Sequence, residues 1–272
     1  MSRIGLIAGK GYLPVLWAKS AREQGKEVYA YQLFEPAYYL LEASVDQVRK
    51  VNIGQLDQLI KTLNNDQIKQ VVMIGKVEKS ILFEGLTLDI RMKKLLGGLK
   101  DLNDDSIMLG IVNELAKENI KVIKQSIHLE HLLISAGVLT NSQPDEQLLS
   151  DMNYGFKMAR EIGRLDIGQT VIVKNKAVLA VEAIEGTDQA IIRGGRIAGP
   201  GVVVAKVSKP QQDFRFDIPT VGDTTLNNLI DIKARALVIE ADRTFLIDKD
   251  DFIKKAEENG ITVMALQGSE LV

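Results

Sequence analysis

The chain of 272 residues contains no cysteine, and this absence removes several kinds of chemistry. Disulfide bonds, thiol nucleophiles and cysteine-rich metal sites are excluded, and the composition is compatible with the cytosol. Aromatic residues make up only 5% of the chain, too few to build stacking platforms for single-stranded nucleic acids. The 34 basic and 36 acidic residues nearly cancel, so the sequence gives no general reason to expect nucleic-acid binding.

Long hydrophobic runs are also missing. No apolar run approaches the roughly 20 residues that a membrane-spanning helix needs. The first apolar run, at 4–8, is shorter than the hydrophobic part of a secretory signal. We therefore expect a soluble, cytoplasmic protein, which a lipid-like substrate could still bring to a membrane surface.

The composition that remains indicates an α/β protein with a sizeable core. Hydrophobic residues make up 46% of the chain, and a length of 272 residues suits two modest domains. In the first third, short apolar runs alternate with helical spacing, which is typical of a parallel, Rossmann-like sheet with helices. We expect strands at 4–8, 27–33, 70–74 and 121–125, and helices at 13–24, at 55–64 and after a cap at 104–106.

A second domain is expected after a stretch rich in Gly, Asn, Ser and Pro. This stretch predicts a linker at 136–144, between a Rossmann-like domain at 1–135 and a mixed α/β domain at 145–272. The second domain should begin with a long helix that has Pro144 at its first position. We also expect a hairpin at 170–183, a loop or loop–helix–loop at 186–201, strands at 202–206, 236–240 and 261–265, and helices at 224–232 and 250–259.

A glycine-rich turn joins the first predicted strand to the first predicted helix. Gly9 and Gly11 allow the backbone to approach an anion closely, and the amides at a helix start favour negative charge. Pro14 takes the place of the third glycine of a dinucleotide fingerprint, and the P-loop pattern is absent. The turn therefore fits the phosphates of a mononucleotide diphosphate better than NAD, and the alternative is a plain tight turn.

Two basic residues follow predicted buried strands. Ligands of parallel sheets bind beyond the carboxyl ends of the strands. Lys76 follows the strand at 70–74 and is a candidate phosphate contact, or else an exposed lysine. Arg243 follows the strand at 236–240 and can clamp a phosphate through two hydrogen bonds, or else pair with an acid on the surface.

An acidic stretch at 182–188 ends another apolar strand. Glu185 and Asp188 carry hard oxygen atoms of the kind that Mg²⁺ prefers. Thr187, between them, is expected to cap the next segment and is also a candidate phosphate contact.

The most informative stretch is 209–219, which reads Lys-Pro-Gln-Gln-Asp-Phe-Arg-Phe-Asp-Ile-Pro. Its two prolines disfavour a continuous helix, so it should be extended or looped. In a strand, Asp213, Arg215 and Asp217 would share one face and the apolar residues between them the other. This row of charges, preceded by Lys209, suits a divalent metal and a phosphorylated substrate. The alternative is an edge strand with a solvated charged face.

The two histidines, His128 and His131, are weaker candidates. Their spacing differs from that of zinc-binding helices, and no third ligand is obvious, so a metal site there is disfavoured. No G-x-S-x-G elbow is present either, so we do not expect a catalytic triad.

Several of these stretches resemble, in the same order along the chain, motifs of the LpxI-type UDP-2,3-diacylglucosamine pyrophosphatases. They are residues 5–14, 75–77, 182–188, 209–219 and 240–244. The most specific pieces are Glu-Gly-Thr-Asp at 185–188 and Gln-Asp-Phe-Arg-Phe-Asp-Ile-Pro at 212–219. The resemblance covers essentially the whole chain.

The resemblance implies an enzyme of lipid A biosynthesis in a Gram-negative bacterium, with two α/β domains. Such enzymes hydrolyse UDP-2,3-diacylglucosamine to UMP and 2,3-diacylglucosamine 1-phosphate (lipid X), and they need a divalent cation, usually Mg²⁺. The first domain is then expected to hold the UDP side, and the second to supply acids and a pocket for the acyl chains. The resemblance also implies a lipid product held between the domains, and peripheral contact with the inner membrane.

An aspartate of the family's motif is important for catalysis, and this role is carried onto Asp217 first and Asp213 second, with Arg215 between them. On a regular strand, residues four apart lie about 13 Å from each other, so the two aspartates could not share an ion. Asp217 is therefore the preferred metal ligand or water-orienting base, and Asp188 and Glu185 are further metal candidates. The alternative functions are a nucleotide-sugar or NAD(P)-binding enzyme, such as a reductase, and a non-catalytic carrier of an acylated sugar.

Overall fold

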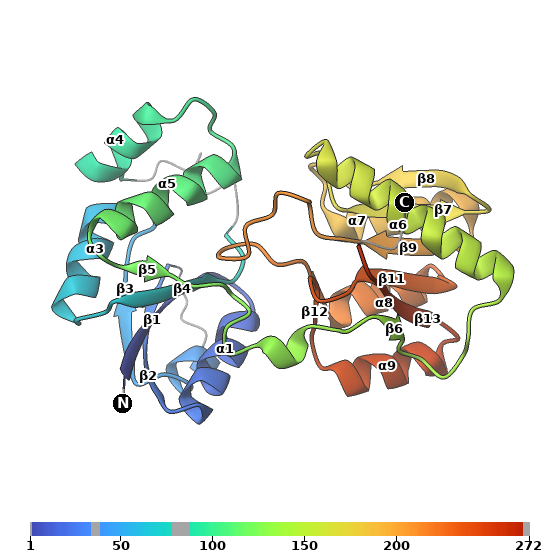
Figure 1. The fold of residues 1–272 in the computed structure, drawn as a ribbon, viewed down its shortest axis with the longest axis horizontal. Helices are drawn as coiled ribbons and strands as arrows, with labels where there is room; N and C mark the ends of the chain where they lie inside the picture. The colour runs from blue at the N-terminus through green and yellow to red at the C-terminus, as the bar shows by residue number, and fades with distance from the viewer. Residues whose placement is uncertain (1, 34–38, 78–86, 269–272) are drawn as a thin grey trace. The chain divides into compact units, whose positions relative to one another are not determined.

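The computed structural model describes residues 2–33, 39–77 and 87–268. The chain forms two compact units (Figure 1). One comprises Met1–Leu129 together with Phe214–Asp217, and the other comprises Glu130–Asp213 together with Ile218–Val272. Each unit has its own sheet and its own hydrophobic core.

The first unit contains a five-stranded sheet, parallel throughout, in the order β3-β2-β1-β4-β5. Its strands are β1 (Ser2–Ala8), β2 (Lys26–Gln32), β3 (Gln47–Lys50), β4 (Gln70–Ile74) and β5 (Lys121–Val122). The parallel, Rossmann-like sheet predicted from the alternation of elements is therefore confirmed. The strand order reverses between β1 and β4, which is the point where sheets of this kind bind ligands.

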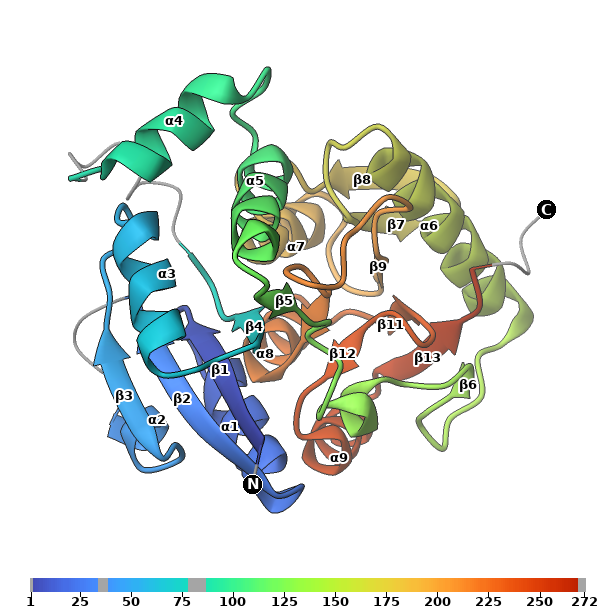
Figure 2. The ribbon, with the colours of Figure 1, turned by 60° about the vertical axis from the view of Figure 1, so that its left-hand side comes forward.

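Helices cover both faces of this sheet (Figure 2). Helix α1 (Leu13–Glu23) packs on β2, with α2 (Tyr39–Glu42) against it. The other face carries α3 (Leu56–Asn65) and α5 (Asp104–Lys117). Helix α4 (Ile90–Gly98) packs against α3 and α5.

Two features of this helical layer differ from the expectation. The N-cap of α5 is Asn103, whose side chain accepts a hydrogen bond from the amide of Ser106, so the cap precedes the expected stretch at 104–106. Asp104 and Asp105 instead lie in the first turn, where their charges favour the helix dipole. Helix α4 was not expected, because its two consecutive glycines are poor helix formers.

The second unit contains a six-stranded mixed sheet in the order β6-β13-β11-β9-β7-β8. Its strands are β6 (Gly137–Val138), β7 (Thr170–Lys174), β8 (Ala177–Val181), β9 (Val203–Lys206), β11 (Ala236–Glu240) and β13 (Thr262–Leu266). The central strands β9, β11 and β13 run parallel, whereas β6 and β7 are antiparallel to their neighbours. The short strands β10 (Thr220–Val221) and β12 (Phe245–Leu246) pair separately.

The mixed α/β fold and the antiparallel hairpin of β7 and β8 confirm the prediction for this half of the chain. Strand β6 lies within 136–144, the range expected as a linker, and pairs with β13. The segment at 186–201 is a loop–helix–loop, with α7 (Thr187–Ala198) at its centre.

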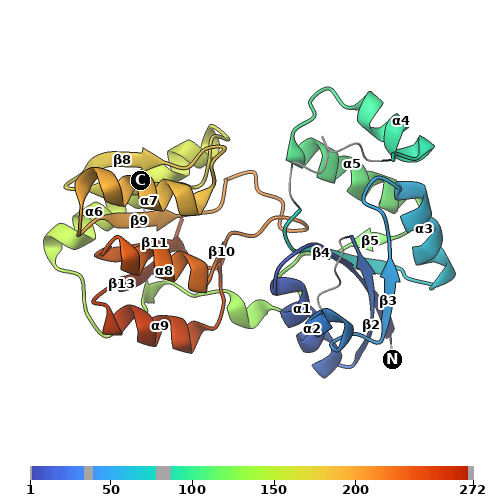
Figure 3. The same cartoon turned by 180° about the vertical axis from the view of Figure 1, so that it is seen from behind.

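Helices also cover both faces of the second sheet (Figure 3). One face carries α6 (Glu146–Arg164), and the other carries α7, α8 (Asp223–Asp231) and α9 (Lys249–Glu258). A short 3₁₀ turn, η2 (Glu130–Leu132), precedes β6. Asp145 caps α6, so Pro144 stands before the cap and not at the first helical position, where it was expected. Strands β9 and β11 are buried along their whole length, because both faces of the sheet are packed.

Candidate functional site

In the first unit, the loops after β1 and β4 are bonded directly to each other. The Lys10 amide donates to the Lys76 carbonyl, and the Lys76 amide donates to the Lys10 carbonyl, both at 2.8 Å. The Gly9 amide also donates to the carbonyl of Ile74 at 2.9 Å. Residues directly opposed in such an antiparallel bridge project their side chains on the same side. The structure therefore sets two exposed lysines side by side where the strand order reverses.

Only glycine fits where these two loops meet. A Cβ on Gly9 would lie 2.7 Å from the carbonyl carbon of Gly75, and one on Gly75 would lie 2.8 Å from that of Gly9. Gly75 also has a φ of +103°, which favours glycine. Sequence reasoning selected Gly9 and Lys76 but passed over Lys10, since a variable position of a glycine loop carries no pattern of its own.

The start of α1 offers fewer backbone amide donors to an anion than the sequence predicts. Tyr12 is the N-cap and makes no side-chain cap, and Pro14 has no N–H to offer. The amides of Val15 and Leu16 both donate to the Tyr12 carbonyl. Within this loop, only amides that precede Pro14 are left to meet a ligand, and Gly11 shapes that stretch with a φ of +102°.

The motif at 209–219 forms a loop with turns. Its middle, Phe214–Asp217, belongs to the first unit. The Gln125 amide donates to the Phe214 carbonyl at 2.8 Å, and the Phe216 side chain packs against the core under α3 and α5. An apolar side chain thus anchors the motif, as expected.

The three charged residues of the motif do not share a strand face. Asp213 belongs to the second unit, whereas Arg215 and Asp217 belong to the first. The strand interpretation is wrong because the turn between these residues breaks the alternation of side chains. Gln125 ties Phe214 to the carboxyl end of β4, since its amide donates to the Phe214 carbonyl and its Nε2 donates to the Met73 carbonyl at 2.7 Å.

In the second unit, buried polar side chains gather at the carboxyl ends of the central strands β9 and β11, which we call the polar edge of this sheet. Lys206 ends β9, Glu240 ends β11, and Glu182 follows β8. Thr170 begins the antiparallel β7 and pairs with Lys206 in register. These four residues are at most 9% exposed, so each polar group needs a partner at this edge.

One network at this edge joins the acidic stretch to the motif loop. The Lys206 ammonium donates to Thr187 Oγ1 at 3.3 Å and to the Thr220 carbonyl at 3.1 Å. Thr187 in turn donates to Glu182 Oε1 at 2.9 Å. Lys206 was not selected from the sequence, because a lysine at the end of an apolar strand reads as an ordinary strand terminus. Glu182 was noted only as the first residue of the acidic stretch and was given no role of its own.

A second network surrounds Glu240. Its Oε2 accepts hydrogen bonds from the amide of Ser208 at 2.8 Å and from the hydroxyl of Ser208 at 2.7 Å. Arg243 Nε donates to the same hydroxyl and lies 3.7 Å from Glu240 Oε1. Arg243 is thus oriented by a buried carboxylate at the root of the motif loop.

The acids proposed as metal ligands already have protein partners. Glu185 is ion-paired with Arg193 and accepts a hydrogen bond from the amide of Ala183. A hydrogen bond from its own amide, followed by that from Arg193, lowers the pKa of Glu185. Asp188 accepts a hydrogen bond from Asn228 Nδ2 at 2.8 Å. Within the described residues, no three His, Cys, Asp or Glu side chains come together as a metal cluster.

The structure also shows the partners of two further residues from the sequence analysis, Lys209 and His128. Lys209 is ion-paired with Asp166, in the loop after α6, at 2.5 Å. His128 is buried, contacts Gln24 Oε1 through Nδ1, and packs edge-on against Trp17. His128 is therefore a core residue of the first unit.

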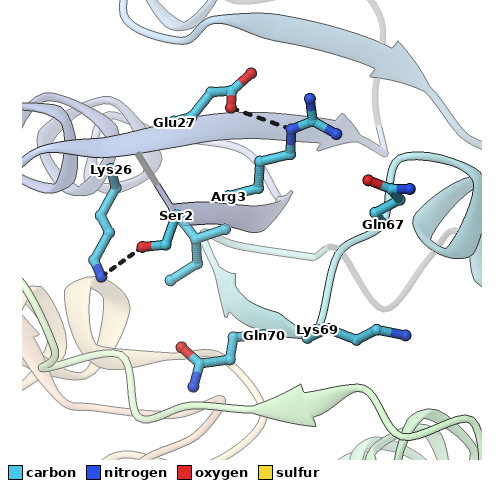
Figure 4. A pocket seen from close by; sticks show the side chains of 8 residues that line it. Ser2, Arg3, Lys26, Glu27, Gln67, Lys69 and Gln70 are labelled. Carbon is cyan, nitrogen blue, oxygen red and sulfur yellow. Dashed lines mark hydrogen bonds and ion pairs between the residues drawn. The ribbon is translucent and has the colours of Figure 1, made fainter.

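A cavity of about 690 Å³ lies at the opposite edge of the first sheet, at the amino ends of β1, β2 and β4 (Figure 4). Two of its cations are already engaged, since Arg3 pairs with Glu27 at 3.1 Å and Lys26 donates to Ser2 Oγ at 3.0 Å. The candidate site residues lie elsewhere, beyond the carboxyl ends of the strands.

Among the described residues, no helix combines the length and the apolar character needed to cross a membrane.

Comparison with known proteins identifies relatives along the whole chain. The model of the LpxI N-terminal domain matches residues 3–132, and that of the LpxI C-terminal domain matches residues 135–264. The UDP-2,3-diacylglucosamine pyrophosphatase LpxI of Caulobacter vibrioides (strain ATCC 19089 / CIP 103742 / CB 15) is 31% identical over 283 residues, which cover 99% of either chain.

Solved structures match only weakly. Phosphoribosylglycinamide synthetase from Anaerococcus prevotii is 12% identical with a TM-score of 0.27, over 68% of this chain and 39% of that one. Glycinamide-RNase-transformylase T from Mycobacterium tuberculosis is 12% identical with a TM-score of 0.26, over 67% of this chain and 44% of that one. The chain spans less than half of either structure, and likenesses this low carry no argument about function.

Proposed function

Because the chain belongs to the LpxI family, we propose that it hydrolyses UDP-2,3-diacylglucosamine to UMP and lipid X in lipid A biosynthesis. The observation that carries this proposal is the end-to-end match to a relative named for that pyrophosphatase activity. Because the proposed substrate carries acyl chains, we expect the enzyme to act in the cytoplasm and to contact the inner membrane peripherally. That the substrate is held between the two domains stays a prediction from the sequence.

The carboxyl edge of the first sheet supports a phosphate-binding role. Lys10 and Lys76 are adjacent through their backbone bridge, and Gly9 keeps that region free of a side chain. Two neighbouring ammonium groups favour an anion with more than one negative charge. We assign this edge, with Gly11, to the diphosphate on the uridine side of the substrate.

The reaction replaces one phosphoanhydride bond by a bond to water. Water attacks the phosphorus attached to the sugar, the bond to the bridging oxygen breaks, and UMP leaves with the electron pair. We assign Asp217 to orient that water, with Asp213 as the second candidate and Arg215 as a cation for the developing charge. Arg243 and Lys209 are assigned to phosphate contacts. Thr187, the third candidate from the sequence, gives its hydroxyl proton to Glu182 and so is not assigned a direct contact.

A divalent cation, Mg²⁺ or another, fits part of this donor set. Buried Glu182 has one oxygen, Oε2, without a hydrogen-bond partner within the described residues, and carboxylate oxygen is the donor that Mg²⁺ prefers. Asp188 is the further carboxylate that the second unit offers, and Glu185 would first have to leave Arg193. Asp217, in the first unit, stays the metal candidate predicted from the sequence. When bound, the ion would neutralise charge on the pyrophosphate oxygens.

The direct test is the release of UMP from UDP-2,3-diacylglucosamine by the purified protein, with Mg²⁺ and with EDTA. We expect release with Mg²⁺ and none with EDTA. Release in both conditions would refute the metal requirement alone. No release from folded protein would refute the activity. Tight NAD(P) binding would then favour the reductase alternative, and binding of an acylated sugar without phosphate chemistry would favour the carrier.

A further inference from the structure

Lys206 occupies an unusual position for a lysine. It is the last residue of β9 and is only 7% exposed, and its backbone pairs with Thr170 in the middle of the sheet's polar edge. Burial of an ammonium group is unfavourable unless hydrogen bonds and opposite charge compensate for the lost water. Core packing alone therefore does not explain a lysine at this position, and a functional role is expected.

The contacts of Lys206 connect the two most specific stretches of the chain. Thr187, which accepts from its ammonium at 3.3 Å, is the first residue of α7 in the acidic stretch at 182–188. Thr220, whose carbonyl accepts at 3.1 Å, follows directly on the motif at 209–219. Lys206 itself precedes that motif, so its ammonium ties together the two ends of the motif loop.

The hydroxyl of Thr187 has a defined orientation in this network. It donates its proton to Glu182 Oε1 at 2.9 Å, which leaves its lone pairs to accept from Lys206. Glu182 is 9% exposed and also supplies a negative charge near the ammonium. Glu182 and Thr187 thus hold the Lys206 ammonium in one place.

The start of α7 adds positive potential at the same place. Its N-cap is Gly186, with a φ of +83°, and no side chain caps the first-turn amides. A glycine cap leaves these amides open to a ligand, and the helix dipole makes this end positive. A buried cation and a positive helix end in one location suit a phosphate group.

We propose that Lys206 contacts a phosphate of the substrate, and that Thr187 and Glu182 act through it as positioning residues. This inference rests on the proposed pyrophosphatase function, since the phosphate in question is that of the substrate. It adds a cation to the reaction that was not evident from the sequence. This cation lies beside the start of the motif whose aspartates are assigned to catalysis.

Lys174 is a matched control in the same unit. It ends β7, at the opposite edge of the sheet, and its ammonium donates to the carbonyls of Ala198 at 3.0 Å and Pro200 at 2.8 Å. Like Lys206 it donates two hydrogen bonds within the unit, but both go to backbone carbonyls and they lie beside the other end of α7. Lys174→Met reports what the loss of a purely structural lysine does.

The experiment compares Lys206→Met, Lys206→Arg and Lys174→Met with the unchanged protein. The readouts are kcat and KM for UMP release, the affinity for inorganic pyrophosphate by calorimetry, and Tm. We expect Lys206→Met to lower kcat/KM about 100-fold, with weaker pyrophosphate binding, and Lys206→Arg to restore part of both. Lys174→Met should change Tm and neither of the other readouts. Equal kcat/KM and equal pyrophosphate affinity in the two methionine variants would overturn the proposal.

The threonine provides a second route if Lys206→Met does not fold. Thr187→Val removes the hydroxyl at constant shape, whereas Thr187→Ser keeps it. We expect the valine variant to lose pyrophosphate affinity and the serine variant to retain it. Equal affinities in the two variants would overturn the positioning role.

The measurement of pyrophosphate affinity distinguishes a failure of the role of Lys206 from a failure of the proposed function. If the unchanged protein releases no UMP but binds pyrophosphate through Lys206, the pyrophosphatase function is wrong and the anion site stands. If it releases UMP and Lys206→Met behaves as Lys174→Met does, the function stands and the role of Lys206 is wrong. Neither release nor binding would overturn both.

Discussion

Lys10 and Lys76 exchange both of their backbone hydrogen bonds, each amide donating to the other carbonyl at 2.8 Å. This bridge joins the loops after β1 and β4, where the strand order of the first sheet reverses. The two lysines come from loops more than sixty residues apart, and the sheet alone brings them together.

Loss of either lysine should weaken substrate binding. We expect Lys10→Met and Lys76→Met each to raise KM about tenfold, with a smaller effect at high salt, because the interaction of an exposed cation with phosphate is screened. Steady-state UMP release at low and high NaCl measures this. Lys69→Met is the control, since Lys69 lines the cavity at the opposite edge of the same sheet. Equal KM values for all three variants would contradict the assignment.

A methyl group at Gly75 should destabilise the first unit. Gly75→Ala combines a φ of +103° with a Cβ only 2.8 Å from the backbone of Gly9, so we expect a loss of about 1–3 kcal/mol. Gly97→Ala is the control, because Gly97 lies in the last turn of α4 and a Cβ added there would meet no neighbouring group within 4 Å, so alanine should stabilise the protein by about 0.5–1 kcal/mol. Urea unfolding followed by circular dichroism measures both. If Gly75→Ala is as stable as the unchanged protein, the close contact of the two loops is wrong.

Asp217→Asn should abolish turnover and leave the fold intact, because the amide is nearly the same size as the carboxylate but can neither act as a base nor attract a cation. Asp213→Asn should have the smaller effect. UMP release together with thermal unfolding separates chemistry from folding. Turnover like that of the unchanged enzyme in folded Asp217→Asn would remove Asp217 from the catalytic role.

Alkaline pH should destabilise the first unit through Tyr31. Burial, followed by the hydrogen bond from its hydroxyl to Asp66 Oδ2 at 2.8 Å, raises the pKa of Tyr31 far above its usual value. Because the folded state holds this proton more tightly than the unfolded state does, the contribution to stability is complete below about pH 10 and falls as the pH rises further.

Tyr31→Phe tests this directly. The variant should lose about 1 kcal/mol at neutral pH, with the hydrogen bond, and should show a weaker decline above pH 10. Urea unfolding at several alkaline pH values gives both quantities. Parallel declines in the two proteins would show that another group is responsible.

The fold was largely predictable, because it follows from local patterns. Apolar runs such as 70–74 and 236–240 match β4 and β11 residue for residue. The motif at 209–219 was recognised by composition, but its strand interpretation failed. The alternation of charged and apolar residues is equally compatible with a loop, and a contact such as Gln125 with Phe214 leaves no trace in that pattern.

The sequence by itself determined which chemistry was available and which class of fold would hold it. The absence of cysteine, the balanced charge, the alternation of strands and helices and the order of the motifs are all properties of residues near each other along the chain. Only the tertiary structure decided that Lys10 stands beside Lys76, and that Lys206 joins Thr187 to Thr220. These relationships depend on strand order and on which strand ends meet at one edge, and no local pattern encodes contacts between such distant residues.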